Sequence, residues 1–157
     1  MEKKLLPILR KYGISYNAFR YVSLGLRNTK CGTRVLASGF LSGRLTSGNT
    51  EGTRFGGDSA LNKHMQNLYD HEPLHNTLKL LENTACAMGT TMVDAAVRWA
   101  YYHSSLEDTD GIILGASSVK QIESNIESIR RGPLPQECLD TFGHIWETLE
   151  PLRGDIL

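Results

Sequence analysis

The chain has 157 residues, of which 40% are hydrophobic and 22% charged, close to the averages for one soluble globular domain. Its 17 basic and 17 acidic residues cancel, which removes the electrostatic argument for nucleic acid or an anionic membrane as a partner. No apolar run approaches the roughly 20 residues needed to span a bilayer, and residues 1–13 are too interrupted by charges and proline for a secretory signal. Three scattered cysteines argue against a disulfide framework, so we expect a cytoplasmic protein.

The first third of the chain predicts a short helix, a strand and a long irregular segment. Apolar residues at helical spacing favour an amphipathic helix through Tyr12, which Gly13 can end. Residues 14–19, ISYNAF, are rich in β-formers and predict a strand. Residues 20–55 lose this periodicity and collect Gly, Ser, Thr and Asn. Loops of that length within a compact domain usually bind something or are disordered.

Two helices are predicted in the middle of the chain. One runs from near Leu74 to Met88, with Gly89 as its stop, and the other from Met92 to about His103, capped by Thr91. The second helix carries one apolar stripe, made of Val93, Ala96, Val97 and Ala100. The aromatic residues beside it are interpreted as packing residues of a helix that covers a barrel: Trp99, Tyr101 and Tyr102.

A strand, a tight turn and a capped helix follow. Residues 112–114 form an unbroken apolar run, as expected for a strand that is covered on both faces. Ser118 then precedes Gln121 by three residues, the spacing of a capping box, and the helix behind it extends to Arg131. A helix amino terminus offers unpaired N–H groups and a partial positive charge to a phosphate. The spacing alone favours a capped helix that binds nothing, because capping boxes are common and most of them bind no ligand.

The predicted elements are unbalanced for a self-contained domain. A last helix from Pro135 to about Leu149 brings the total to two strands and about five helices. Two parallel strands expose unpaired edges and cannot form a covered sheet by themselves. We therefore expect part of the sheet to lie outside this chain and the α/β fold to be incomplete.

Several other residues resemble metal-binding or reactive sites. The segment HEPLH, residues 71–75, formally matches a zinc-hydrolase pattern, which needs a continuous helix through both histidines. Pro73 disfavours helix before it, so we expect the helix to start near Pro73, with His71 outside. Cys86 and Cys138 are interpreted as core thiols, and the acidic residues near the strand as a solvated turn: Glu107, Asp108 and Asp110.

Six segments in order resemble the carboxyl-terminal half of aldo-keto reductases, nearest to the aflatoxin aldehyde reductase branch. They are KYGISYNAF, LASGFLSGR, EGTRF, TTMVDAAVRWAYYHS, DGIILGASSVKQIESN and GPLP. The resemblance implies an α/β fold, the incomplete carboxyl-terminal portion of a (β/α)8 TIM barrel, whose last two strands are ISYNAF and GIILG. It also implies NADPH, laid across the carboxyl ends of the strands.

The resemblance assigns cofactor-binding positions residue by residue. The 2'-phosphate and adenine end of NADPH falls to Gly115, Ser117, Ser118, Gln121 and Asn125. A loop over the pyrophosphate is matched by Leu36, Gly39, Leu41, Gly43 and Arg44, with Arg54 as a further loop arginine. Tyr16, at the end of its strand, matches the tyrosine that stacks on the nicotinamide, although spacing alone would make it a packing aromatic.

The resemblance also implies what this chain lacks. The family's catalytic Asp, Tyr, Lys and His lie on early strands, and this sequence begins after all of them, so no catalytic residue is assigned here. The complete enzyme would reduce an aldehyde or ketone to an alcohol, with a small carbonyl compound as its partner. The 157-residue chain alone is expected to be inactive and poorly stable. The alternative is a non-catalytic interaction or regulatory protein, whose half-barrel pairs with another chain through its strand edges.

Residues 18–35 depart from the family pattern. They stand where the family places a single proline between the strand and the cofactor loop. Intact family sequence on both sides leads us to interpret this insert as translated intron sequence or an error in the assigned coding sequence. A mature transcript containing codons 18–36 would refute that interpretation, and pyrophosphate binding by residues 36–44 would then be in doubt.

Overall fold

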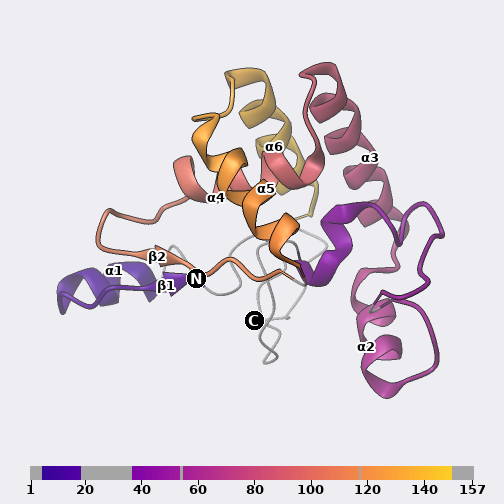
Figure 1. Ribbon diagram of the computed structural model, residues 1–157. Helices are drawn as coiled ribbons and strands as arrows, with labels where there is room; N and C mark the ends of the chain where they lie inside the picture. Colours follow the sequence, from indigo (N-terminus) through magenta and orange to yellow (C-terminus); the bar gives the residue numbers. More distant parts are fainter. Residues whose placement is uncertain (1–4, 19–36, 54, 117, 150–157) are drawn as a thin grey trace.

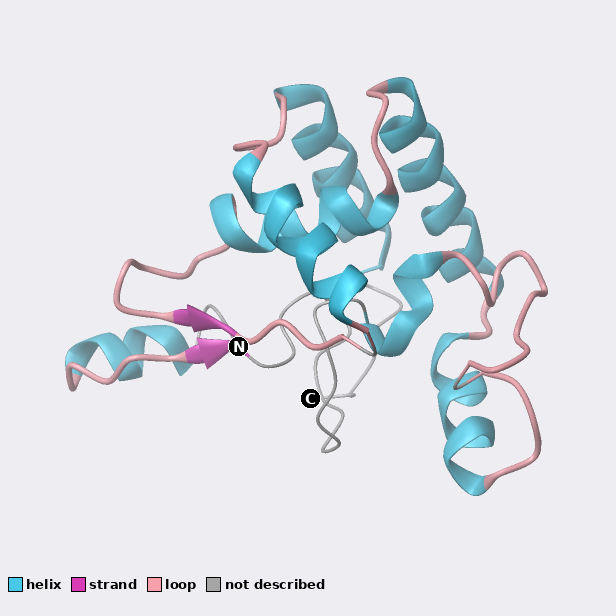
Figure 2. Ribbon diagram, viewed as in Figure 1, coloured by secondary structure: helices cyan, strands magenta, loops and turns pink. Residues whose placement is uncertain are grey.

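The computed structural model describes residues 5–18, 37–53, 55–116 and 118–149, and helices dominate it (Figures 1 and 2). Most of the helices are grouped together, and the helix of residues Leu5–Lys11 lies with two short strands to one side of them (Figure 1). In chain order the elements are α1 (Leu5–Lys11), β1 (Asn17–Ala18), the 3-10 helix η1 (Ala37–Ser42), α2 (Ala60–Tyr69), α3 (Glu72–Ala87), α4 (Met92–Tyr102), β2 (Gly111–Ile112), α5 (Val119–Arg130) and α6 (Gln136–Leu149).

The two strands are parallel, as the sequence predicts, but very short. Asn17 pairs with Gly111 and Ala18 with Ile112, and within the described residues these two strands are the whole sheet. The prediction of a strand buried on both faces is wrong, because Ile113 lies outside β2 with 44% of its surface exposed. Ile112 and Leu114 are partly buried against the core, whereas Ile113 between them is not covered by a second layer among the described residues.

Helix α1 has the predicted extent, but its apolar residues are mostly exposed. It ends at Lys11, and Gly13 follows with a φ of 65°, in the region that favours glycine. Leu6 is its buried residue, whereas Ile8 and Tyr12 are exposed. A helix without an apolar partner face gains little from burial, so α1 must be held by other contacts.

Those contacts come from Asp110, for which the prediction of a solvated turn is wrong. Its side chain is fully buried and forms a two-point ion pair with Arg10, with 3.0 Å between Arg10 Nη1 and Asp110 Oδ1. The same carboxylate accepts the backbone N–H of Tyr16 at 2.7 Å and that of Glu107 at 2.9 Å. We call these four residues the Asp110 cluster. It ties α1, the start of β1 and the turn before β2 together.

The hydrophobic core lies among the helices. Helix α4 packs against α3, α5 and η1, and α3 packs against α6. Cys138 is fully buried there, as predicted, but Cys86 is exposed, because it lies on the outer side of α3. The predicted stripe of α4 is buried at Ala96, Val97 and Ala100.

The aromatic residues of α4 divide into one inner and two outer side chains. Trp99 stacks on Phe142 of α6 with 5.7 Å between ring centroids, which confirms its packing role. Tyr101 is 55% exposed, so its assignment as a packing residue is wrong. Tyr102 is also exposed, and its hydroxyl donates to the carbonyl of Ile129 on α5 at 2.7 Å.

Helix α2 was not expected from the sequence. Ser59 caps it by accepting the N–H of Asn62 at 3.1 Å. Met65 and Tyr69 lie on its buried side, and the Tyr69 ring stacks on Phe40 at 5.1 Å. In the sequence, apolar residues recur at helical spacing from Leu61 through Met65 to Leu68 and Tyr69, so this helix had a signal that the prediction missed.

The start of α3 confirms the prediction for residues 71–75. His71 is the residue before the helix, and Pro73 lies in its first turn. The two ring nitrogens of His75 contact Thr46 Oγ1 at 2.8 Å and Asp70 Oδ1 at 2.9 Å. Within the described ranges, no group of three His, Cys, Asp or Glu side chains could hold a metal ion. None of the described helices is long and apolar enough to cross a bilayer.

Candidate functional site

The amino terminus of α5 is built as the sequence predicts. Ser118 has extended backbone angles, and its hydroxyl accepts the N–H of Gln121 at 3.3 Å. The N–H groups of Val119 and Lys120 belong to the first turn, where their own helix provides no earlier carbonyl. These residues and Gly115 are exposed, so the end of the helix is accessible to a ligand. Ser117 lies outside the described residues.

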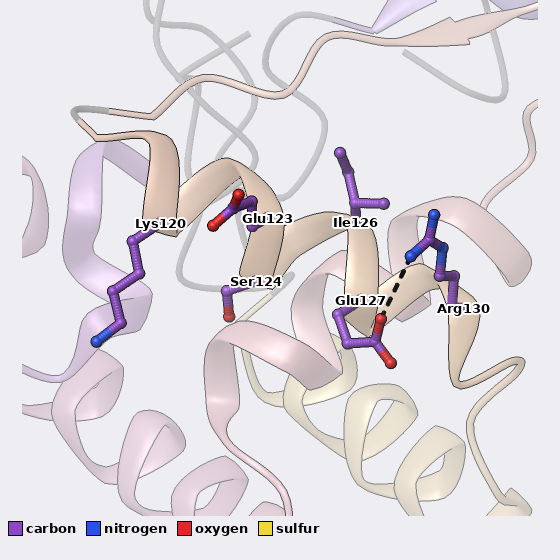
Figure 3. A pocket seen from close by; sticks show the side chains of 6 residues that line it. All are labelled: Lys120, Glu123, Ser124, Ile126, Glu127 and Arg130. Atoms are coloured by element: carbon purple, nitrogen blue, oxygen red, sulfur yellow. Dashed lines mark ion pairs between the residues drawn. The ribbon is translucent and has the colours of Figure 1, made fainter.

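The second predicted segment, η1, lies beside this helix end. Both the view of the whole chain and the close view place the 3-10 helix next to the first turn of α5 (Figures 1 and 3). Two segments that are about 75 positions apart in the sequence, as the residue numbers show, are therefore neighbours in space. Leu36 and Arg54, which the sequence assigns to the same site, fall outside the described residues.

Two glycines, one within η1 and one directly after it, allow backbone angles that other residues rarely adopt. Gly39 has a φ of 96° and Gly43 a φ of 76°, where other residues are strained. A Cβ atom on Gly39 would meet nothing within 4 Å, so its backbone is open to an approaching ligand. A Cβ atom on Gly43 would lie 3.0 Å from the terminal methyl of Met92, so this backbone rests directly on α4.

The remaining predicted residues of η1 have different surroundings. Leu41 is fully buried in the core, so only its backbone could face a cofactor. Arg44 is exposed, and its Nη2 donates to the carbonyl of Glu51 at 3.0 Å. The arginine therefore reaches back to its own loop in this structure, and its guanidinium has further N–H groups for an anion.

Tyr16 and Asn125 lie apart from the exposed helix end. Tyr16 directly precedes β1, so it lies at the amino-terminal end of the described strand. Its carbonyl accepts the N–H of Gly111 at 3.0 Å, which continues the ladder. Asn125 is only 6% exposed and shares the buried side of α5 with Ser128.

A hollow of about 490 Å³ runs along α5, but it is a different surface. Its lining residues, all exposed, are Lys120, Glu123, Ser124, Ile126, Glu127 and Arg130 (Figure 3). An ion pair of 3.7 Å between Glu127 and Arg130 lies near one end of it. The hollow contains none of the predicted cofactor residues and meets the helix end only at Lys120, and its mixed charges do not favour an anion. We therefore place the candidate site where η1 meets the helix end.

A buried charged cluster between α4 and the end of α5 was not predicted from the sequence. Asp94 on α4 is 3% exposed, and its carboxylate accepts the Thr90 hydroxyl, Arg98 Nη1 at 3.2 Å and Arg131 Nη1 at 3.1 Å. Burial acts to raise the pKa of this carboxyl. Hydrogen bonds from Thr90, Ser128 and Arg98 and the charge of Arg131 outweigh burial, so the pKa lies below its usual range. In the sequence, an acidic residue in the first turn of a helix indicates only a favourable charge near the helix end.

Comparison with known proteins agrees with the resemblance. The aldo/keto reductase family model matches residues 28–147. An aldo-keto reductase of Pseudocercospora fijiensis is 31% identical over 152 residues, which are 96% of this chain and 47% of that protein. Aflatoxin B1 aldehyde reductase member 2 of Rattus norvegicus is 30% identical over 158 residues, 95% of this chain and 39% of that protein. Oxidoreductase sirO of Leptosphaeria maculans is 30% identical over 151 residues, 95% of this chain and 42% of that protein.

These matches cover almost the whole of this chain and less than half of each relative. The family match begins within the segment of residues 18–35 and extends through η1, the helical core and most of α6. Because the family model covers far more than half of the sequence, the chain belongs to the aldo/keto reductase family.

Proposed function

We propose that this chain is the NADPH-binding, carboxyl-terminal part of a cytoplasmic reductase that converts aldehydes or ketones to alcohols. The family implies a (β/α)8 barrel, and the described residues contain two parallel strands that do not close one. The observation that carries the proposal is the meeting of η1 with the capped amino terminus of α5. Both are segments to which the family pattern assigns phosphate binding.

The residues at this meeting suit a dinucleotide phosphate. The first-turn N–H groups of α5 and the Ser118 hydroxyl can donate to the 2'-phosphate, and the exposed Lys120 adds a positive charge. The open backbone at Gly39 lets η1 approach pyrophosphate oxygens closely. NADPH bound there would supply the hydride for the carbonyl carbon. The chain's own residues would hold and orient the cofactor.

Under this proposal, we expect the 157-residue chain to be inactive when it is assayed alone. Reduction of a carbonyl needs a proton donor beside the oxygen, and none of the residues here matches the family's catalytic tyrosine. We therefore propose that the chain binds NADPH without turning over a small aldehyde or ketone. Steady oxidation of NADPH by the purified chain in the presence of an aldehyde would contradict this part.

The decisive test changes the cap of α5 without removing it. In the Ser118→Asp variant, aspartate can still cap the helix, but its charge repels a phosphate. We expect the variant to bind NADPH at least about tenfold more weakly than the unchanged chain, a loss of about 1.4 kcal/mol. Binding is measured by NADPH fluorescence and by the NMR shifts of the Val119 and Lys120 amides.

The matched control is Ser59→Asp, because Ser59 caps α2 in the same way. This variant adds the same charge at a helix end far from the proposed site in sequence, and it should bind NADPH like the unchanged chain. Equal weakening in both variants would point to net charge alone. If the unchanged, folded chain left the α5 amides unmoved at saturating NADPH, the proposal would be lost.

One observation favours the interaction protein as a second candidate. Ile14 is 51% and Ile113 44% exposed, and both flank the two-stranded sheet. The outer edges of two parallel strands, with exposed apolar residues beside them, are suited to pairing with another chain. A soluble oligomer of defined mass that fails to bind NADPH would favour this candidate over the reductase part.

A further inference from the structure

Helix α4 connects the two halves of the proposed cofactor site. Met92, at its first position, lies against the backbone at Gly43, and the helix packs against α5. The place of the α5 amino terminus relative to η1 therefore depends on how α5 sits on α4. Packing contacts between apolar side chains allow small slides, whereas charged hydrogen bonds fix direction as well as distance.

Asp94 provides those directional bonds at the far end of α5. Its Oδ1 accepts from Arg131, the residue that ends α5, and its Oδ2 accepts from Arg98 and Thr90 on the α4 side. Arg98 also donates to the carbonyls of Gly132 at 2.8 Å and Pro133 at 2.7 Å. The carboxyl end of α5 and the turn after it are thus tied to one buried carboxylate.

Because a helix is nearly rigid, a small tilt at one end displaces its other end. Helix α5 has 12 residues, so with a rise of 1.5 Å per residue it is about 18 Å long. A tilt of about 5° at the Asp94 end would move the amino terminus by roughly 1.5 Å. Hydrogen bonds to a phosphate need N···O distances of about 2.7–3.2 Å, so such a displacement breaks them.

We propose that Asp94 is a positioning residue that holds the α5 amino terminus at the correct distance from η1, and so sets the preference for NADPH over NADH. The inference rests on the proposed function. The two coenzymes differ by the 2'-phosphate, which is the group assigned to the helix end. Misplacing α5 should therefore weaken NADPH binding and leave the contacts of η1 with the shared pyrophosphate in place.

The test compares affinities for NADPH and NADH in the Asp94→Asn variant. Asparagine keeps the shape of the side chain and removes its charge, while the Thr91 cap of α4 is retained. We expect the ratio of NADPH to NADH affinity to fall at least about fivefold, the lower range of coupling between sites. A purely structural role would lower the folded fraction, which weakens both coenzymes equally and leaves the ratio unchanged.

Two further variants keep the result decisive. Asp140→Asn removes the same charge from an exposed residue of α6, and it should leave the ratio unchanged. Arg131→Met removes one arm of the cluster at a side chain that is 52% exposed, so it should fold even if the Asp94 variant does not, and should lower the ratio by a smaller factor. An unchanged ratio in the folded variants overturns the role of Asp94. If the unchanged chain itself does not prefer NADPH, the proposed function fails, and this inference with it.

Discussion

A buried carboxylate holds elements together in two parts of the described structure, the strand pair and the helical core. The Asp110 cluster joins α1 to the strand pair, and the Asp94 cluster, with Thr90, Arg98, Ser128 and Arg131, joins α4 to α5. Both centre on a buried carboxylate with an arginine partner. Only the Asp94 cluster is surrounded by a hydrophobic core, whereas at the strand pair Ile112 is partly buried against that core and Ile14 and Ile113 are exposed.

This difference indicates that the strand pair and the helical core have different sources of stability. In the helical layer, burial of apolar surface supplies most of the favourable free energy, and the charges specify geometry. At the strand pair little apolar surface is buried, so the charged hydrogen bonds of Asp110 carry more of the attachment. The strand pair should therefore open without unfolding of the helices, whereas the reverse should not occur.

The largest effect is expected in the helical core. Leu81 on α3 is fully buried, and Leu81→Ala should lower the free energy of unfolding by about 3 kcal/mol, through lost burial and a cavity. Urea unfolding followed by circular dichroism measures it. A loss under about 1 kcal/mol would show that the helical core is not the main source of stability.

A smaller and more local effect is expected from Asp110→Asn. The variant loses the ion pair with Arg10 and weakens acceptance of the Tyr16 and Glu107 N–H groups. Hydrogen exchange of the Gly111 amide, which donates to Tyr16, should accelerate at least about tenfold, while amides of α4 keep their protection. Parallel acceleration in both regions would contradict separate opening of the strand pair.

Acid should act on the strand pair in the same way. The Arg10 hydrogen bonds hold the pKa of Asp110 at about 2, below the value of about 3.9 for an unfolded aspartate. Because the folded pKa is the lower one, the contribution of Asp110 is complete above about pH 4 and disappears as the pH falls towards about 2. Exchange of the Gly111 amide, corrected for intrinsic rates, should show this window. The Asp110→Asn variant should lack it.

The smallest effect is expected for Ile113→Ala. An exposed side chain with no apolar cover contributes little, so the free energy of unfolding should change by no more than about 0.5 kcal/mol. A loss as large as that of Leu81→Ala would mean that something covers this residue in solution. Sedimentation of the unchanged chain would then distinguish a second copy from cover within one chain.

The sequence predicts features that depend on near neighbours. The cap at Ser118, the stop at Gly89, and the helix start near Pro73 each follow from residues within one turn, and all three appear in the structure. Proximity of η1 and α5 could be expected only through the family resemblance, because no local pattern relates them.

The errors concern contacts between distant residues. Arg10 and Asp110 are 100 positions apart, and Asp94 and Arg131 are 37 apart. No periodicity shows that these acids are buried, and acidic residues near turns are usually solvated. Likewise, Ile113 and Cys86 have apolar or helical surroundings in sequence, but their exposure depends on which layers are present to cover them.

The contact between Gly43 and Met92 gives the proposed cofactor loop a soft support. The thioether side chain has several rotatable bonds, so its methyl group can move by tenths of an ångström at low cost. Any other residue at position 43 would be strained by the positive φ, whereas the Met92 methyl group can move aside. If the loop binds a nucleotide as proposed, this contact lets the loop shift slightly while the helices beneath it keep their places.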